Sequence, residues 1–305
     1  MTDASGIYAY ADVGRQGLGH GLFAWAHALI WARRYDAELL PPIWLRPRIG
    51  PWLRRERDKR TYFLQFQGAG PGVALRRLRL LATRKRVIST LDEKGGTPPR
   101  KDGLHVFQMG QALDTEAIFR PMIGHHHAVG EALRAMARPH LLPRPASEPF
   151  IAIHIRQGDF QAANTDALSK GVKNTATPVH WFADTLSAVR SALGEAAPAR
   201  IFSDAPPAGL AAIMTMPNVE CAPRAPAIHD MLAIADADLL IGSGSNFSLW
   251  GSYLSQIPRI SHPGQTIASV LQDPARELEY DPAGGPIRLP AGFNWPGTVT
   301  GRDRP

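Results

Sequence analysis

Residues 151–160, IAIHIRQGDF, begin as an apolar strand and end in a cluster of polar side chains. His154 interrupts the apolar run, and Arg156 and Asp159 follow in a turn that contains a glycine. Ligands of open α/β sheets bind beyond the carboxyl ends of the strands. We therefore expect His154, Arg156 and Asp159 to lie in a binding site.

The chain from residue 150 onward alternates strands and helices. We predict strands at 150–155, 199–204, 218–221, 238–242 and 259–261. We predict helices at 178–193, with Thr177 as N-cap and Pro178 in the first helical position, near 207–215, at 228–237 and at 247–256. This order indicates a doubly wound α/β domain.

The beginning of the chain has a β-α-β pattern. A strand over 6–13, a glycine-rich turn over 14–21, a helix over 22–35 and a strand over 37–40 are predicted. Residues 41–104 have no clear periodicity, and no prediction is made for them. RPHLLPRPASEP, residues 138–149, contains four prolines and reads as a linker. We therefore expect domains at 1–149 and 150–305.

Composition limits the class of protein. The 305 residues, 44% of them hydrophobic, suffice for one large domain or two ordinary ones. One cysteine, Cys221, excludes an internal disulfide framework and a four-cysteine zinc site. No apolar run approaches the roughly 20 residues of a spanning helix, and no export leader is evident. The expectation is a cytoplasmic protein.

The net charge of +7 is concentrated in residues 47–60 and 76–86. These basic segments are either a solvated face or a contact with an anionic partner, such as the inner face of a membrane or a lipid-linked phosphate. No aromatic-interleaved basic motif is present, so no nucleic acid partner is expected. The three histidines 125–127 fit a loop or helix start better than a metal site.

A second half of the expected site is LLIGSGSNFSLWGSYL, residues 239–254. A buried strand runs into small residues and then directly into a helix, where backbone N–H groups and the positive helix end attract an anion. The residues concerned are Gly242, Ser243, Gly244, Ser245 and Asn246. Such a turn also occurs with only an N-cap role. Combined with the forked guanidinium of Arg156, it favours a diphosphate site.

Carboxylates form the third part of the site. Asp204 ends a strand, and either it or Asp230 can accept hydrogen bonds from a ribose or a base edge. Asp230 can equally be a helix cap. Asp236 and Asp238 resemble a metal-binding pair, but their strand follows them instead of preceding them. No metal is expected.

Four blocks of the sequence resemble one family. HIRQGDF resembles the H-x-R-x-G-D-[YF] motif of the inverting fucosyltransferases, IFSDAP resembles their F-S-D motif, and residues 230–254 resemble their D-x-x-x-M and S-x-F-S-x-W-G-x-Y-L block. Residues 14–40 resemble their N-terminal glycine-rich turn and helix. The blocks follow the family order over nearly the whole chain, and they match the alpha-1,2-fucosyltransferase family best.

That resemblance implies a GT-B-like fold, with two Rossmann-type domains facing a cleft. It implies GDP-fucose as co-substrate, no cofactor and no metal, and a glycan or lipid-linked oligosaccharide as acceptor. Arg156 matches the arginine that holds the donor β-phosphate. The other matched positions are His154 beside the nucleoside, Asp230 at guanine, Ser245, Asn246 and Phe247 in the phosphate block, and Gly17, Gly19 and His20 in the N-terminal glycine-rich loop.

Two questions stay open at this point. His20 and Asp159 are the candidates for a catalytic base, although Asp159 can instead brace its Gly-Asp turn. His20 and Gly21 stand where the family usually has Asn-Gln, so a different GDP-sugar or a non-catalytic nucleotide-sugar-binding protein is an alternative function.

Overall fold

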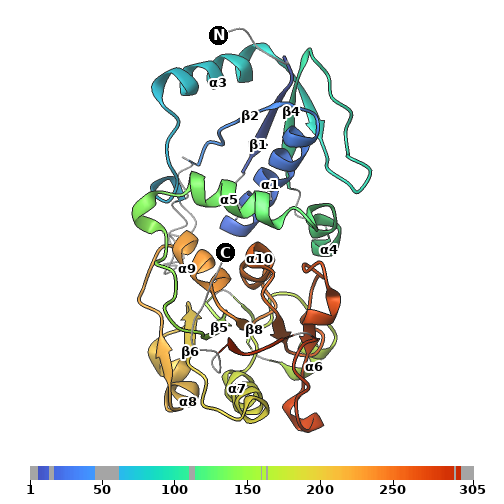
Figure 1. The fold of residues 1–305 in the computed structure, drawn as a ribbon. Helices are drawn as coiled ribbons and strands as arrows, with labels where there is room; N and C mark the ends of the chain where they lie inside the picture. Colours follow the sequence, from blue (N-terminus) through green and yellow to red (C-terminus); the bar gives the residue numbers. More distant parts are fainter. Residues whose placement is uncertain are drawn as a thin grey trace. The chain divides into compact units, whose positions relative to one another are not determined.

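The computed structural model divides into two compact units, residues 1–142 and 143–305, each with one parallel sheet (Figure 1). The structure describes residues 6–13, 17–44, 62–109, 114–158, 160–162, 164–291 and 293–296. The expected α/β class is confirmed, because both sheets are parallel and most of their successive strands are connected through helices.

The second unit contains a six-stranded sheet. Its strands are β5 (Ile151–Ile155), β6 (Ala199–Ser203), β7 (Val219–Cys221), β8 (Leu239–Gly242), β9 (Arg259–Ser261) and β10 (Glu277–Glu279). The order is β10-β9-β8-β5-β6-β7, and all pairs are parallel. This is the Rossmann order, in which the order of successive strands across the sheet reverses between β5 and β8. Ligands bind at that reversal.

The two faces of this sheet have separate cores. Ile151, Ile153 and Ile155 pack on one face against apolar residues of α7 (Val179–Leu193). Ala152 and the flanking Phe150 pack on the other face with residues of α9 (Ala227–Ala235). Side chains alternate along a strand, so His154 shares the α9 face. The remaining helices of the unit are α6 (Thr165–Ser169), η4 (Pro207–Leu210), α8 (Ala211–Met214), α10 (Asn246–Ser255), η5 (Pro274–Arg276) and η6 (Pro282–Gly284).

The first unit contains a four-stranded sheet in the order β2-β1-β4-β3, with all pairs parallel. The strands are β1 (Tyr8–Asp12), β2 (Glu38–Leu40), β3 (Lys85–Ser89) and β4 (Gly103–Gln108). The helices are α1 (Leu18–Arg34), η1 (Tyr62–Leu64), α3 (Pro71–Thr83), α4 (Thr115–Phe119), η2 (Arg120–Met122), α5 (His126–Met136) and η3 (Pro139–Leu141). Most residues of α1 are buried, so α1 supplies the centre of this core.

The structure corrects the predicted start of α1. The helix begins at Leu18, so Gly19 and His20 lie in its first turn and only Gly17, the N-cap, precedes it. The predicted glycine-rich loop is therefore wrong for Gly19 and His20. Gly21 lies within the helix. A Cβ there would lie 3.3 Å from the carbonyl oxygen of Val13, so the glycine allows α1 to pack closely against the chain that follows β1.

A second correction concerns α7. Its N-cap is Pro178 and its first helical residue is Val179, so Thr177 does not cap the helix as predicted. The Thr177 hydroxyl is buried and has no hydrogen-bond partner in the described part of the chain. The three histidines 125–127 form the start of α5, with His125 as N-cap, which confirms the predicted helix start. No helix in the described ranges is long and apolar enough to cross a bilayer.

Candidate functional site

The carboxyl ends of β5 and β8 are tied together by Ser243. His154 pairs in register with Gly242, and the Ser243 backbone N–H donates to the His154 carbonyl oxygen at 3.0 Å. The Ser243 hydroxyl donates to the same oxygen at 2.9 Å and accepts from the Arg156 backbone N–H at 2.9 Å. Its proton is thus used within the protein, and the buried Ser243 side chain fixes where Arg156 leaves the strand.

The loop after β8 leads directly into α10. Ser245 is the N-cap and its hydroxyl accepts from the Ser248 N–H at 3.2 Å. Asn246 and Phe247 form the first turn, where helix N–H groups have no carbonyl partner within the helix. This turn contains no acidic residue, so its partial positive charge is not neutralised locally. The arrangement suits an anionic ligand.

Gly244 packs closely against a second loop, which contains Gln265 and Ile267. A Cβ on Gly244 would overlap Gln265 Oε1 and lie 2.9 Å from Ile267 Cδ1. Gln265 is 1% exposed and its Nε2 donates to the Leu168 carbonyl oxygen at 2.9 Å. Ile267 has φ +64°, a strained value for a β-branched residue. Gln265 belongs to no motif, and its contact with Gly244 is visible only in the fold.

Arg156 follows β5 and is braced by Asp204. Its Nη1 lies 2.8 Å from Asp204 Oδ2, and Asp204 Oδ1 accepts from the Gln157 N–H at 2.8 Å. A Cβ at Gly158 would lie 2.8 Å from Asp204 Oδ2, which explains the glycine of the quoted motif. The Arg156 side chain keeps 31% of its area exposed, so a ligand can reach it. Asp159 lies outside the described residues.

His154 is buried beside α10. Its Nδ1 is 2.6 Å from Ser248 Oγ, and its ring stacks on Phe247 with centroids 5.0 Å apart. Burial lowers the pKa of His154 to about 4, against an opposing effect of Asp204, while Arg156 lowers it further. The imidazole is therefore neutral at physiological pH. It connects β5 to the first turn of α10. The sequence does not predict the role of Ser248 as the hydrogen-bond partner of His154.

Asp230 lies in the first turn of α9 but does not cap it. The N-cap is Pro226, and no side-chain hydrogen bond caps this helix. Asp230 Oδ1 is buried without a hydrogen-bond partner among the described residues. Loss of hydration raises the pKa of Asp230 to about 7. The capping alternative is therefore wrong, and Oδ1 keeps a hydrogen-bond acceptor that none of the described residues uses.

Asp236 and Asp238 lie near the amino ends of the strands, opposite to the end at which Arg156 lies. Asp236 is the C-cap of α9, and Asp238 Oδ2 accepts from the Phe150 N–H at 3.0 Å, next to the amino end of β5. These two carboxylates therefore cannot hold a metal beside Arg156. Within the described residues, no cluster of three or more histidine, cysteine or acidic side chains could hold a metal ion.

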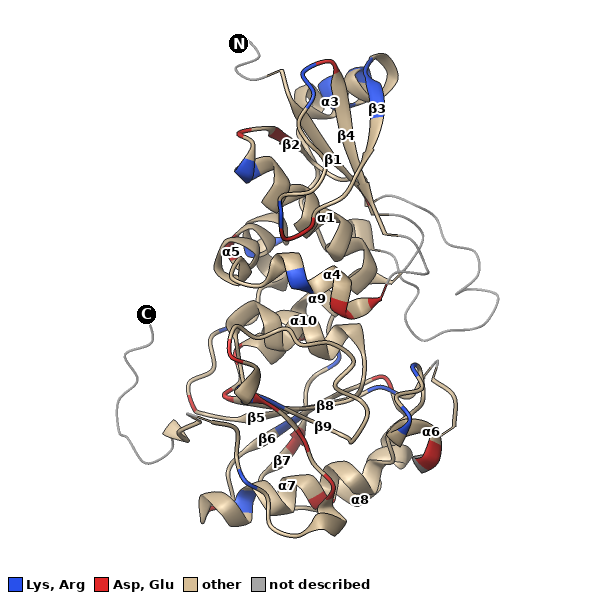
Figure 2. Cartoon of the chain, turned by 90° about the vertical axis from the view of Figure 1, so that its right-hand side faces the viewer, with Lys and Arg blue, Asp and Glu red and all other residues tan. Residues whose placement is uncertain are grey.

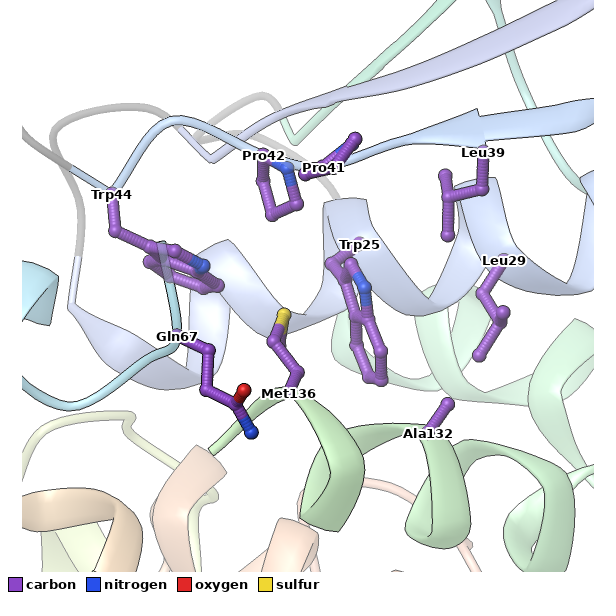
Figure 3. A pocket seen from close by; sticks show the side chains of 9 residues that line it. All are labelled: Trp25, Leu29, Leu39, Pro41, Pro42, Trp44, Gln67, Ala132 and Met136. Carbon is purple, nitrogen blue, oxygen red and sulfur yellow. The ribbon is translucent and has the colours of Figure 1, made fainter. Parts of the chain in front are cut away.

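The first unit has a cavity of its own, of about 200 Å³. Its lining is predominantly apolar and includes Trp25, Leu29, Trp44 and Met136, with Gln67 as the one amide (Figure 3). No charged residue lines it, so a diphosphate has no partner there. His20 lies elsewhere on α1, edge-on to Phe23 at 6.1 Å, and burial lowers its pKa.

No family model matches the sequence, and no curated protein matches it. Among solved structures, the chain is similar to the alpha-1,6-fucosyltransferase NodZ co-crystallised with GDP, with 16% identity, coverage of 84% of this chain and 94% of that chain, and a TM-score of 0.39. A NodZ structure from Bradyrhizobium gives 14% identity, with coverage of 84% of this chain and 94% of that chain, and a TM-score of 0.39.

POFUT1 in complex with GDP gives 11% identity, with coverage of 86% of this chain and 98% of that chain, and a TM-score of 0.44. The E. coli heptosyltransferase WaaC with ADP gives 13% identity, with coverage of 89% of this chain and 92% of that chain, and a TM-score of 0.43. Because all four TM-scores lie below 0.5, the function proposed below is based on the residues of the site and on the sequence motifs.

Arg156→Lys is expected to weaken GDP binding at least about tenfold, because lysine keeps the charge but loses the two-pronged hydrogen bonding of the guanidinium. Isothermal titration calorimetry and a melting curve on the same sample measure affinity and folding together. Arg200→Lys is the matched control, since Arg200 forms a surface pair with Glu220 at 2.7 Å. Unchanged GDP affinity in folded Arg156→Lys would remove Arg156 from the site.

Asp230→Asn is expected to stabilise the protein more at pH 8 than at pH 5. The native carboxyl has a raised pKa, about 7, so it binds its proton more tightly than in the unfolded chain, and wild-type stability falls as pH rises toward 7. Removing this titration should raise the melting temperature at pH 8 by roughly 2–4 °C.

The same substitution should reduce the preference for GDP over ADP.

Asp184→Asn, an exposed position on α7, is the control for that comparison. A pH-independent difference in melting temperature between Asp230→Asn and wild type would contradict the raised pKa. Equal effects on GDP and ADP would show that the base is read elsewhere.

Gly244→Ala is expected to destabilise the second unit by about 1–3 kcal/mol, because the added methyl group overlaps Gln265. GDP binding should fall with it, since the backbone of the loop must shift. Thermal melting with and without GDP measures both effects. Gly209→Ala, whose Cβ would have no neighbour closer than 3.8 Å, should behave as wild type, and an equally stable Gly244→Ala would show that the loop tolerates the methyl group.

Proposed function

We propose that this chain is a glycosyltransferase that binds a nucleoside diphosphate sugar at the carboxyl ends of β5 and β8. The observation that carries the proposal is the juxtaposition of two anion-binding elements where the strand order reverses. Arg156, braced by Asp204, follows one strand, and the α10 N-terminus, free of acidic residues, follows the other. Ser243 joins the two.

GDP is the nucleotide that this site fits best. Guanine presents ring and exocyclic N–H donors on one edge, and the buried Oδ1 of Asp230 is an acceptor without a protein partner among the described residues. The sequence motifs support the same assignment, because HIRQGDF, IFSDAP and the 230–254 block resemble those of enzymes that use GDP-fucose. We therefore propose GDP-fucose as the donor and a GT-B-like fold.

The proposed reaction is an inverting transfer. The bond between the sugar anomeric carbon and the β-phosphate oxygen breaks, the acceptor hydroxyl oxygen bonds to the opposite face of that carbon, and the hydroxyl proton leaves late. Negative charge grows on the departing diphosphate, where Arg156 and the α10 amides stabilise it, and one such contact contributes roughly 10²–10³ in rate. His154 keeps Phe247 and Ser248 in place.

The remaining parts of the proposal follow from the sequence. The acceptor is a glycan or a lipid-linked oligosaccharide, the enzyme works in the cytoplasm at the inner face of the membrane, and His20 or Asp159 receives the proton. No metal takes part, because Arg156 and the helix dipole already provide positive charge at the leaving group.

GDP release from GDP-fucose, measured with and without added glycan acceptors, tests the proposed reaction. We expect release to continue at an unchanged rate in EDTA. Tight GDP binding without release under any acceptor would favour the non-catalytic nucleotide-sugar-binding alternative, and release from GDP-mannose but not GDP-fucose would favour another GDP-sugar. Loss of activity in EDTA that Mn²⁺ or Mg²⁺ restores would contradict the metal-independent mechanism.

A further inference from the structure

Helix α3 has its apolar side chains on the outside. Leu80 is its buried residue, at 8% exposure, whereas Leu75 is 71% and Leu78 53% exposed. These two leucines are three residues apart and share one face of the helix, opposite to Leu80. A helix that only covered the sheet would turn this face to water with polar side chains. The exposure of Leu75 and Leu78 is therefore not explained by packing against the sheet.

The exposed apolar surface continues onto β3. This strand pairs with β4 and forms the edge of the first sheet as far as the structure describes it. Ile88 of β3 is 59% exposed, and Lys85 and Arg86 at the start of the strand are exposed as well. We call α3 and β3 together the α3–β3 surface.

The segment from residue 62 to residue 91 contains charged side chains of one sign. Residues 62–91 contain six lysines and arginines and no aspartate or glutamate: Arg76, Arg77, Arg79, Arg84, Lys85 and Arg86. Figure 2 shows these basic positions gathered on α3 and at the beginning of β3.

Three of these cations have partners within the first unit. Arg76 pairs with Glu38, and Arg77 and Arg84 donate to backbone carbonyl oxygens. The other three, Arg79, Lys85 and Arg86, have exposed side chains, and Lys85 lies near enough to Asp102 to help lower the pKa of that exposed carboxyl.

We propose that the α3–β3 surface lies on an anionic lipid bilayer, with Leu75 and Leu78 inserted among the headgroups and Arg79, Lys85 and Arg86 facing lipid phosphates. Exposed leucines beside exposed cations are the pattern of an interfacial helix. A second copy of this chain is the poorer occupant, because its surface would bring the same positive charge into contact. This proposal stands on the first unit alone and does not depend on the proposed function.

Vesicle sedimentation tests the proposal on the full chain. Wild type should sediment with vesicles of phosphatidylcholine and phosphatidylglycerol but not with phosphatidylcholine alone, and rising sodium chloride should release it. Leu75→Ser/Leu78→Ser and, separately, Arg79→Gln/Arg86→Gln should each reduce binding about tenfold. Val172→Ser and Arg144→Gln/Arg224→Gln, exposed positions of the second unit, should bind as wild type.

Melting temperatures and GDP affinity of all variants should match wild type, so that lost lipid binding is not lost folding. Binding to neutral vesicles, or binding unaffected by the leucine pair, would overturn the proposal. So would a wild-type dimer in solution that Leu75→Ser/Leu78→Ser converts to monomer without any lipid binding, because the leucines would then serve self-association.

Discussion

The hydroxyl of Ser243 determines the geometry on which the rest of the site depends. One side chain donates to the carbonyl at the end of β5 and accepts from the N–H that follows, while its own backbone continues β8. The two strand ends that lie at the reversal of the sheet are thereby locked in register. Arg156 and the α10 N-terminus start from these ends, so their positions relative to each other are set by buried hydrogen bonds.

The electrostatics of the site follow from this placement. Asp204 orients the Arg156 guanidinium, and Gly158 leaves the room that Asp204 needs. Burial keeps His154 neutral, so it adds no charge of its own. Asp230 has the opposite problem, since burial without a partner makes its ionised form costly. An N–H donor at Asp230 would offset that cost.

The sequence predicts much of the second unit because its strands are short buried runs between turn residues. Residues 239–242, for example, are apolar up to the glycine and match β8. The first unit is harder to predict. β3 begins with Lys85 and Arg86 at an exposed edge and therefore lacks the apolar pattern of a strand. The sequence predicts too late a start for α1, because a glycine that serves close packing, as Gly21 does, looks like part of a turn.

The residues of the site divide in the same way. Arg156, His154 and the small residues after β8 could be predicted, because a strand end followed by polar or small residues has a local signature. Gln265 and the bracing role of Asp204 could not, since both depend on contacts between segments far apart in the chain.

The central claim is that a nucleoside diphosphate binds where β5 and β8 end, and a crystal structure with GDP tests it most directly. The account predicts phosphate oxygens within hydrogen-bonding distance of the Arg156 guanidinium and of the backbone N–H groups that open α10, with the guanine edge on Asp230. GDP bound elsewhere, with no phosphate oxygen in contact with the Arg156 guanidinium, would contradict it.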